Sequence, residues 1–298
     1  MNNPYDKNLT SNKFSPTFDC GIYTARIPLL GIKTKKTMKL PLNIHLRGTF
    51  VFGSEDSDRS QFAGHYARVL VDSGVNVVFI TDSPSLYNNR NESELDVLTK
   101  QLSLGDMDNE RYRVNELTGK FNDGLVNDDG GLSVYYSMES KNSEEGSRES
   151  YHSKLVSLLF EISEDERMKA KYNLNETGVH GKFASVFIDE DYMYGFNDKG
   201  SLSQAIKALK REGIGVVMCG SDENRFARVN DSIGNVVIFH MYDPTQLDMF
   251  GAYSRSCGNN KNHMRLDGRD VSNLGFNEFH FYEKDKCGVT TVAKFDRK

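Results

Sequence analysis

One stretch of eight residues has the composition of a loop that binds nucleotide phosphates. Gly53-Ser54-Glu55-Asp56-Ser57-Asp58-Arg59-Ser60 matches the pattern G-x-x-x-x-G-K-[ST] at its first and last positions. In such a loop, backbone N–H groups surround the phosphates, the lysine bridges the β- and γ-phosphates, and the Ser or Thr hydroxyl holds Mg²⁺. The stretch therefore predicts a Mg-ATP site in which Gly53, Arg59 and Ser60 contact the nucleotide and Ser60 also contacts the metal.

The same stretch departs from the pattern at two positions. Asp58 stands where glycine is expected, and Arg59 stands where lysine is expected. Asp58 adds a side chain and a negative charge where the backbone must approach a polyphosphate, and Glu55 and Asp56 add two further carboxylates. Arg59 keeps the positive charge, but a planar guanidinium does not replace an ammonium at a tight site. The alternative is a loop that keeps its shape without the ligand, and these departures favour that alternative.

A second stretch could supply metal and water chemistry. Ala184–Ile188 is an apolar run that ends in Asp189-Glu190, which is the Walker B pattern. In that pattern the Asp holds Mg²⁺ and the Glu polarises the attacking water, so Asp189 is a predicted metal ligand and Glu190 a predicted catalytic base. The structural alternative is a strand that ends in an acidic turn, since Asp191 follows directly.

The first stretch lies in a predicted strand–helix–strand unit. Thr49–Phe52 is a short β-branched and aromatic strand, and Ser60–Ser73 has apolar residues at helical spacing. Gly74 then marks the helix end, and Val75–Thr81 is a continuous apolar strand typical of a strand that is covered on both faces. This unit predicts a parallel sheet.

The remaining elements extend the same α/β pattern. Residues 1–20 are predicted to be a flexible leader and 21–298 a single domain, in which 83–130 is an insertion outside the core. Asn173–Gly181 is predicted to be a loop. Further strands are expected at Ile22–Leu30, Thr37–Ile44, Leu132–Met138, Phe183–Ile188, Ile214–Met218, Val236–Met241, Phe276–Tyr282 and Gly288–Phe295, and helices at Glu92–Leu102, Tyr151–Ile162, Ser203–Arg211 and Gln246–Tyr253.

Composition limits the function classes. The net charge of −5 indicates no large basic face of the kind that isolated DNA-binding modules carry, although a ring can concentrate a few cations at a pore. The four cysteines and seven histidines show no metal-ligand spacing, so a zinc site is not expected. No apolar run is long enough for a transmembrane segment, and we expect a cytoplasmic location, peripheral to the inner membrane only through partners.

The order of these elements resembles the nucleotide-binding domain of type IV secretion and conjugation coupling proteins (the TraD/TraG group) in the HerA/FtsK superfamily of P-loop NTPases. The resemblance rests on these stretches: Arg47–Gly53; Gly131–Ser137 with Tyr151–Phe160; Val186–Glu190 with Leu202–Gly213 and Ile214–Met218; and Asn235–Tyr242 with Asp243-Pro244. Phe276–Phe295 is similar to the closing strands of the family. It implies a RecA-like α/β fold with a mostly parallel sheet, flanking helices and closing β-strands, a hexameric ring, protein partners in a secretion or conjugation complex, and DNA. Cys219-Gly220-Ser221 replaces the usual polar Thr-Gln of the sensor strand, which puts γ-phosphate sensing in doubt.

Three hypotheses follow. The favoured one is a catalytically impaired coupling-protein homologue that acts as an adaptor or ring subunit. The second is an active Mg-ATP-hydrolysing motor in which Arg59 replaces the lysine. The third is an unrelated α/β binding protein, which would be excluded if the strands of Phe52 and Ile188 lie side by side with their carboxyl ends at one crevice.

Overall fold

The fold is described by a computed structural model of the chain. It describes residues 17–26, 33–54, 58–81, 98–100, 102–121, 124–137, 145–175, 178–189, 200–221, 229, 232–241, 271–275, 277–283, 288–289 and 293–294. In chain order, the elements are β1 (Thr17–Arg26), β2 (Lys33–Pro41), α1 (Leu42–His45), β3 (Thr49–Phe52), α2 (Arg59–Asp72), β4 (Asn76–Thr81), the 3-10 helix η2 (Leu104–Asp106), β5 (Tyr112–Glu116), β6 (Leu132–Tyr136), α4 (Glu145–Glu164), β7 (Lys171–Asn175), β8 (Gly178–Lys182), β9 (Ala184–Asp189), α5 (Ser201–Arg211), β10 (Gly215–Gly220), β11 (Asn235–Ile238), β12 (Glu278–Glu283), β13 (Gly288–Val289) and β14 (Ala293–Lys294).

One mixed sheet organises the molecule. Its strand order is β2-β1-β14-β12-β11-β3-β10-β9-β4-β6-β5, with β13 attached to β12. The strands from β11 to β5 are all parallel to their neighbours, whereas β12, β14, β1 and β2 continue the sheet in antiparallel pairs. The predicted α/β fold with a mostly parallel sheet and closing strands is therefore confirmed, and the fold is RecA-like.

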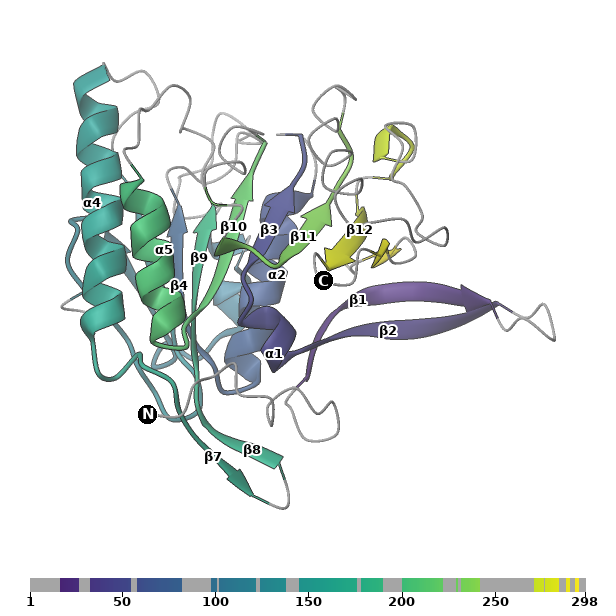
Figure 1. The fold of residues 1–298 in the computed structure, drawn as a ribbon, viewed down its shortest axis with the longest axis horizontal. Coiled ribbons are helices and arrows are strands. Elements are labelled where there is room, and N and C mark those ends of the chain that lie inside the picture. The colour runs from purple at the N-terminus through teal and green to yellow at the C-terminus, as the bar shows by residue number, and fades with distance from the viewer. Residues whose placement is uncertain are drawn as a thin grey trace.

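Helices cover both faces of the parallel part, and this explains its continuous apolar strands. On one face, Phe62, Tyr66 and Leu70 of α2 pack against alternate strand residues such as Val51 and Phe187. The intervening strand residues face α4 and α5 on the other side of the sheet in a second apolar cluster. Figure 1 shows this arrangement, with α4 and α5 in front of the sheet and α2 behind it. Fully burying each such large apolar side chain contributes roughly 1.5–3 kcal/mol, so the two clusters hold the three layers together.

Most of the predicted elements are confirmed within a few residues, and four are corrected. The predicted strand Gly288–Phe295 contains two short strands, β13 and β14. Residues 42–44, the end of the predicted strand Thr37–Ile44, form the short helix α1 together with His45, and Leu42 and Ile44 of this helix pack into the apolar core. The predicted loop Asn173–Gly181 contains most of the antiparallel hairpin β7–β8. An unexpected strand, β5, lies within residues 83–130 and pairs in parallel with β6 at the edge of the sheet.

Other predictions lie partly or wholly outside the described residues. β1 begins at Thr17, four residues inside the predicted leader, and residues 1–16 lie outside the described part. The predicted helix Gln246–Tyr253 also lies outside it, as do residues 92–97 of the predicted helix Glu92–Leu102. Among the helices that the structure describes, none has the length and apolar character that a membrane crossing requires.

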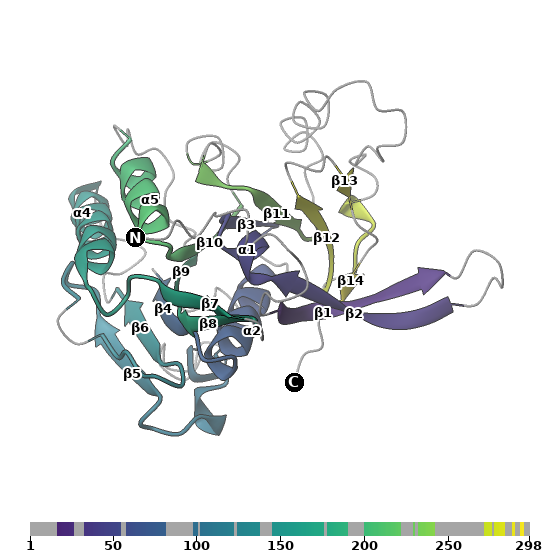
Figure 2. The ribbon, with the colours of Figure 1, turned by 60° about the horizontal axis from the view of Figure 1, so that its bottom comes forward.

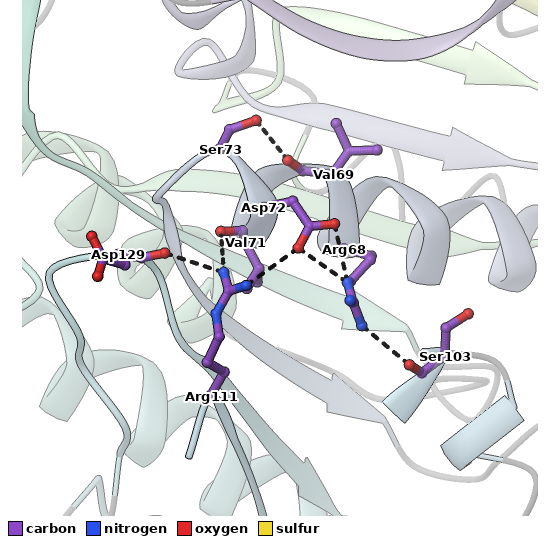
Figure 3. A network of polar contacts seen from close by, with 8 residues as sticks. All are labelled: Arg68, Val69, Val71, Asp72, Ser73, Ser103, Arg111 and Asp129. Atoms are coloured by element: carbon purple, nitrogen blue, oxygen red, sulfur yellow. Dashed lines mark hydrogen bonds and ion pairs between the residues drawn. The ribbon is translucent and has the colours of Figure 1, made fainter. Parts of the chain in front are cut away.

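The carboxyl end of α2 is fixed by two arginines (Figure 3). Arg111 Nη2, from the segment before β5, donates to the carbonyls of Val71 (2.9 Å) and Asp129 (3.2 Å). Arg68 Nε donates to both carboxylate oxygens of Asp72, at 3.2 and 3.1 Å. Positive side chains satisfy the free carbonyls at a helix C-terminus and complement its dipole. Gly74 follows with φ +83°, as expected of the residue that ends the helix.

Candidate functional site

The candidate site lies at the carboxyl edge of the parallel sheet. Val51 of β3, Cys219 of β10 and Asp189 of β9 are in register, so the ends of these strands meet at one edge. The strands of Phe52 and Ile188 are not neighbours, because β10 lies between them, so the arrangement that would exclude an unrelated α/β protein is met only in part. Their carboxyl ends nevertheless reach the same edge, where parallel α/β sheets bind their ligands.

The two predicted metal ligands are brought together at this edge. Ser60 lies in the first turn of α2, and Asp189 is the last residue of β9. Ser60 Oγ donates a hydrogen bond of 3.0 Å to Asp189 Oδ1, although 129 residues separate them in sequence. Asp189 is 6% exposed. A hydroxyl and a carboxylate this close are oxygen ligands of the kind that Mg²⁺ takes together with phosphate oxygens and water.

Arg59 is buried within the predicted phosphate loop. Its side chain is 1% exposed, and its Nη1 donates a hydrogen bond of 2.6 Å to the carbonyl oxygen of Gly53, the first residue of the loop. The guanidinium is therefore folded back against its own loop. As the first residue of α2, Arg59 also places a cation at a helix N-terminus, where the helix dipole favours anions.

Asp58 is buried directly before this helix. It is 6% exposed and occupies the N-cap position, but its side chain makes no capping hydrogen bond. An N-cap aspartate normally accepts from the first free N–H groups of the helix. The N–H groups that would face a phosphate are thus not capped by this carboxylate, while its negative charge remains beside them.

A second set of hydrogen bonds, between Ser54 of the loop and His240, was not apparent from the sequence. The backbone N and the Oγ of Ser54 both donate to the carbonyl of His240, each at 3.1 Å. His240 follows β11, and Phe239 N donates to the carbonyl of Phe52 at 2.8 Å, so the chain after β11 anchors the start of the loop. The sequence predicts an apolar strand that ends near Met241, but it does not indicate which strand or loop this segment contacts.

The remaining predicted site residues cannot be placed. The predicted catalytic Glu190 and the loop carboxylates Glu55 and Asp56 lie outside the described residues. Among the residues that are described, no group of three His, Cys, Asp or Glu side chains could hold a metal ion by itself. Of the described residues at this edge, Ser60 and Asp189 are the ones that could contact a metal beside phosphate oxygens and water.

The opposite, amino edge of the sheet holds a different polar cluster. His45 Nε2 lies 3.0 Å from Ser185 Oγ, and His45 Nδ1 lies 2.7 Å from the Tyr66 hydroxyl. Ser185 Oγ donates to the Gly215 carbonyl at 3.3 Å, which fits a neutral imidazole that donates through Nε2 and accepts from Tyr66. Complete burial lowers the pKa of His45 from its ordinary 6.5 to about 3. A Cβ at Gly215 would meet His45 Nε2 at 2.3 Å, so only glycine leaves room for the ring.

Comparison with known proteins identifies the fold. No protein-family model and no curated protein matches the sequence. Among solved structures, the chain is similar to the bacterial conjugative coupling protein TrwB in complex with sulphate, with a TM-score of 0.53 at 10% identity over 97% of this chain and 96% of that one. The comparison with TrwB in complex with the GTP analogue GDPNP gives a TM-score of 0.52 at 12% identity over 97% of each chain.

The chain is also similar to the genome packaging NTPase B204 from Sulfolobus turreted icosahedral virus 2 in complex with AMPPCP, with a TM-score of 0.49 at 14% identity over 85% of this chain and 99% of that one. The likeness to TrwB confirms the predicted RecA-like P-loop fold.

Proposed function

We propose that this chain is a catalytically impaired member of the coupling-protein type of P-loop NTPase, acting as an adaptor or ring subunit in a conjugative DNA transfer or type IV secretion apparatus. Its fold supports the coupling-protein type. Its partners would be the proteins of that apparatus and further copies of itself, because TrwB is a conjugative coupling protein. The division into a leader, residues 1–20, and a single domain 21–298 stays part of this proposal, although residues 17–20 of that leader belong to β1.

A single observation carries the impairment. Arg59, at the position of the phosphate-binding lysine, is buried and donates to Gly53 O of its own loop at 2.6 Å. A nucleotide would have to displace this hydrogen bond and accept the carboxylate of Asp58 beside its phosphates. A guanidinium is planar and bulkier than an ammonium, so it does not replace the lysine that bridges the phosphates at a tight site. These contacts support the proposal that the loop keeps the conformation of a phosphate-binding loop but no longer binds nucleotide.

Calorimetric titration with Mg-ATP tests this role. We expect no saturable heat at millimolar nucleotide for the wild-type protein and none for Arg59→Ala, because the loop lacks the ammonium that bridges the phosphates. Saturable wild-type binding that Arg59→Ala removes would contradict the proposal, since it would mean that the guanidinium holds the phosphates.

A second candidate function is an active Mg-ATP-hydrolysing motor for DNA or protein. The contact that favours it is the 3.0 Å hydrogen bond between Ser60 and Asp189, which keeps the metal pair together. On this alternative Asp189 positions Mg²⁺ and Glu190 activates water. Glu190→Gln would then abolish turnover but leave nucleotide bound. Equal turnover by wild type and variant would exclude the role of Glu190.

A further inference from the structure

The two ends of the sheet carry opposite charge. At one end is the lysine ribbon, which we define as the antiparallel pair β1–β2. Strand β2 holds four lysines and no acidic residue, in a chain whose net charge is −5. At the other end is the acidic turn, which we define as residues 106–110, from the last residue of η2 toward β5; it contains Asp106, Asp108 and Glu110. The strand order places β2 and β5 at the two extremes of the sheet, and Figure 2 shows them at opposite ends of the molecule.

The lysine ribbon extends away from the body of the protein. β1 and β2 pair along their whole length, from Thr17↔Pro41 to Arg26↔Lys33. Within the described part of the chain, β1 joins the rest of the sheet at Ile22 and Tyr23, opposite β14. Figure 1 shows the pair projecting as a two-stranded arm. The arm is attached at its base, where Leu40 is buried and Met38 packs against the core.

The charged side chains of the arm are available for contact. Lys35, Lys36 and Lys39 are all exposed. None of them forms an ion pair with another residue in the part of the chain that the structure describes. Lysines on an edge strand prevent pairing with a like strand, since two such edges repel each other. A neighbour that presents carboxylates would instead be attracted.

The acidic turn offers such carboxylates in a fixed shape. Asp106, Asp108 and Glu110 are exposed. Asp108 Oδ1 accepts from the backbone N of Glu110 at 3.1 Å, and Arg111 N donates to the Asp108 carbonyl at 2.9 Å, so the turn is closed by its own hydrogen bonds. The lysine ribbon and the acidic turn are therefore complementary, but they lie too far apart on one molecule to meet.

We infer that the lysine ribbon of one copy of this chain docks on the acidic turn of the next copy. Two different surfaces at opposite ends make a head-to-tail contact, which closes into a ring or continues as a filament. A second copy is the chosen partner because it presents the exposed carboxylates of the acidic turn, in a fixed arrangement, to the lysines of the ribbon. The inference deepens the proposed role as a ring subunit and rests on it, but it does not depend on nucleotide binding.

Charge exchange between the two surfaces tests the contact. Variant one carries Lys35→Glu, Lys36→Glu and Lys39→Glu; variant two carries Asp106→Lys, Asp108→Lys and Glu110→Lys. All six side chains are exposed, so the fold should persist, which circular dichroism checks. Self-association is measured by sedimentation velocity without nucleotide, at an ionic strength below about 0.05 M, where screening is weak.

We expect the wild-type protein to associate and each variant alone to associate at least roughly 100-fold more weakly, because like charges then face each other. An equimolar mixture of the two variants should recover association. In the mixture an acidic ribbon faces a basic turn, and a basic ribbon faces an acidic turn. Control lysines on other elements, exchanged as Lys120→Glu, Lys171→Glu and Lys207→Glu, change the net charge as variant one does and should leave association intact.

Three results would overturn the inference: a wild-type protein that stays monomeric, variants that associate like wild type, or a mixture that does not recover. Binding of duplex DNA that variant one loses, with self-association unchanged, would instead assign the ribbon to nucleic acid and would also overturn it. None of these results bears on Arg59, so this inference and the proposed impairment fail separately.

Discussion

The parallel sheet has a buried polar residue near α2 at each of its two edges, His45 at the amino edge and Arg59 at the carboxyl edge, and the two residues differ in charge and in their contacts. At the amino edge, the neutral imidazole of His45 has a partner at each ring nitrogen, Tyr66 and Ser185. At the carboxyl edge, the cation of Arg59 is buried at the N-terminus of α2, where the helix dipole opposes it. The amino edge is thus arranged for stability, whereas the carboxyl edge keeps a charge that stability alone does not favour. That difference agrees with a candidate site at the carboxyl edge.

The largest effect is expected at the amino edge as pH falls. His45 has a pKa near 3 in the folded protein and about 6.5 when unfolded, so the unfolded state binds more protons between these values. The stability contributed by neutral His45 is complete above pH 6.5 and is lost as pH falls toward 3, by about 1.4 kcal/mol per pH unit. Urea unfolding from pH 7 to pH 4 should show this slope, and His45→Gln should remove it.

His152→Gln is the matched control for this experiment, because His152 is only partly buried and bonds Ser201 Oγ at 3.2 Å. If His45→Gln keeps the same acid slope as wild type, the neutral buried state of His45 is not the source of the slope.

One substitution made at both edges compares them directly. Ser185→Ala leaves a fully buried His45 N–H without its acceptor, and we expect a loss of about 1–3 kcal/mol in the free energy of unfolding. Ser60→Ala removes a similar hydroxyl, but Ser60 is only partly buried, so water can replace it and the loss should be about 0.5–1 kcal/mol. Chemical denaturation of both variants measures the difference. A larger loss for Ser60→Ala would reverse the comparison.

The smallest effects are expected at the far end of α2. Arg111→Ala removes the donor to the carbonyls of Val71 and Asp129 and should cost about 1 kcal/mol. Arg68→Ala breaks the i,i+4 pair with the half-exposed Asp72 and the 3.1 Å hydrogen bond from Arg68 Nη1 to the Ser103 carbonyl, and should cost a similar amount, about 1 kcal/mol. Thermal unfolding of the two variants measures both losses, and an unchanged stability for either variant would show that its carbonyl contacts add nothing.

The sequence could predict what depends on neighbours along the chain. The unit from Thr49 to Thr81 was predicted within one residue at each boundary, because its strand and helix periodicities are strong. The meeting of Ser60 and Asp189 was also predicted, since parallel strands bring their carboxyl ends to one edge. Strand β5 was missed, because its side chains are polar and only partly buried and so leave no apolar pattern.

Features set by pairing between distant segments could not be predicted. Nothing local to β10 indicates that it lies between β3 and β9, and nothing in Ser54 indicates its bond to His240. The direction of the Arg59 side chain also depends on the folded loop. Sequence alone identified the guanidinium as a departure from the pattern, but only the structure places it on Gly53 O.

The most direct test of the site is to repair its loop. Asp58→Gly with Arg59→Lys restores the complete pattern from Gly53 to Ser60. Calorimetric titration with Mg-ATP should give saturable binding for this variant and none for the wild-type protein, and adding Ser60→Ala to the repaired loop should weaken the dependence on Mg²⁺. Wild-type binding as tight as that of the repaired variant would contradict the account, because the loop would then hold nucleotide with Arg59 in place.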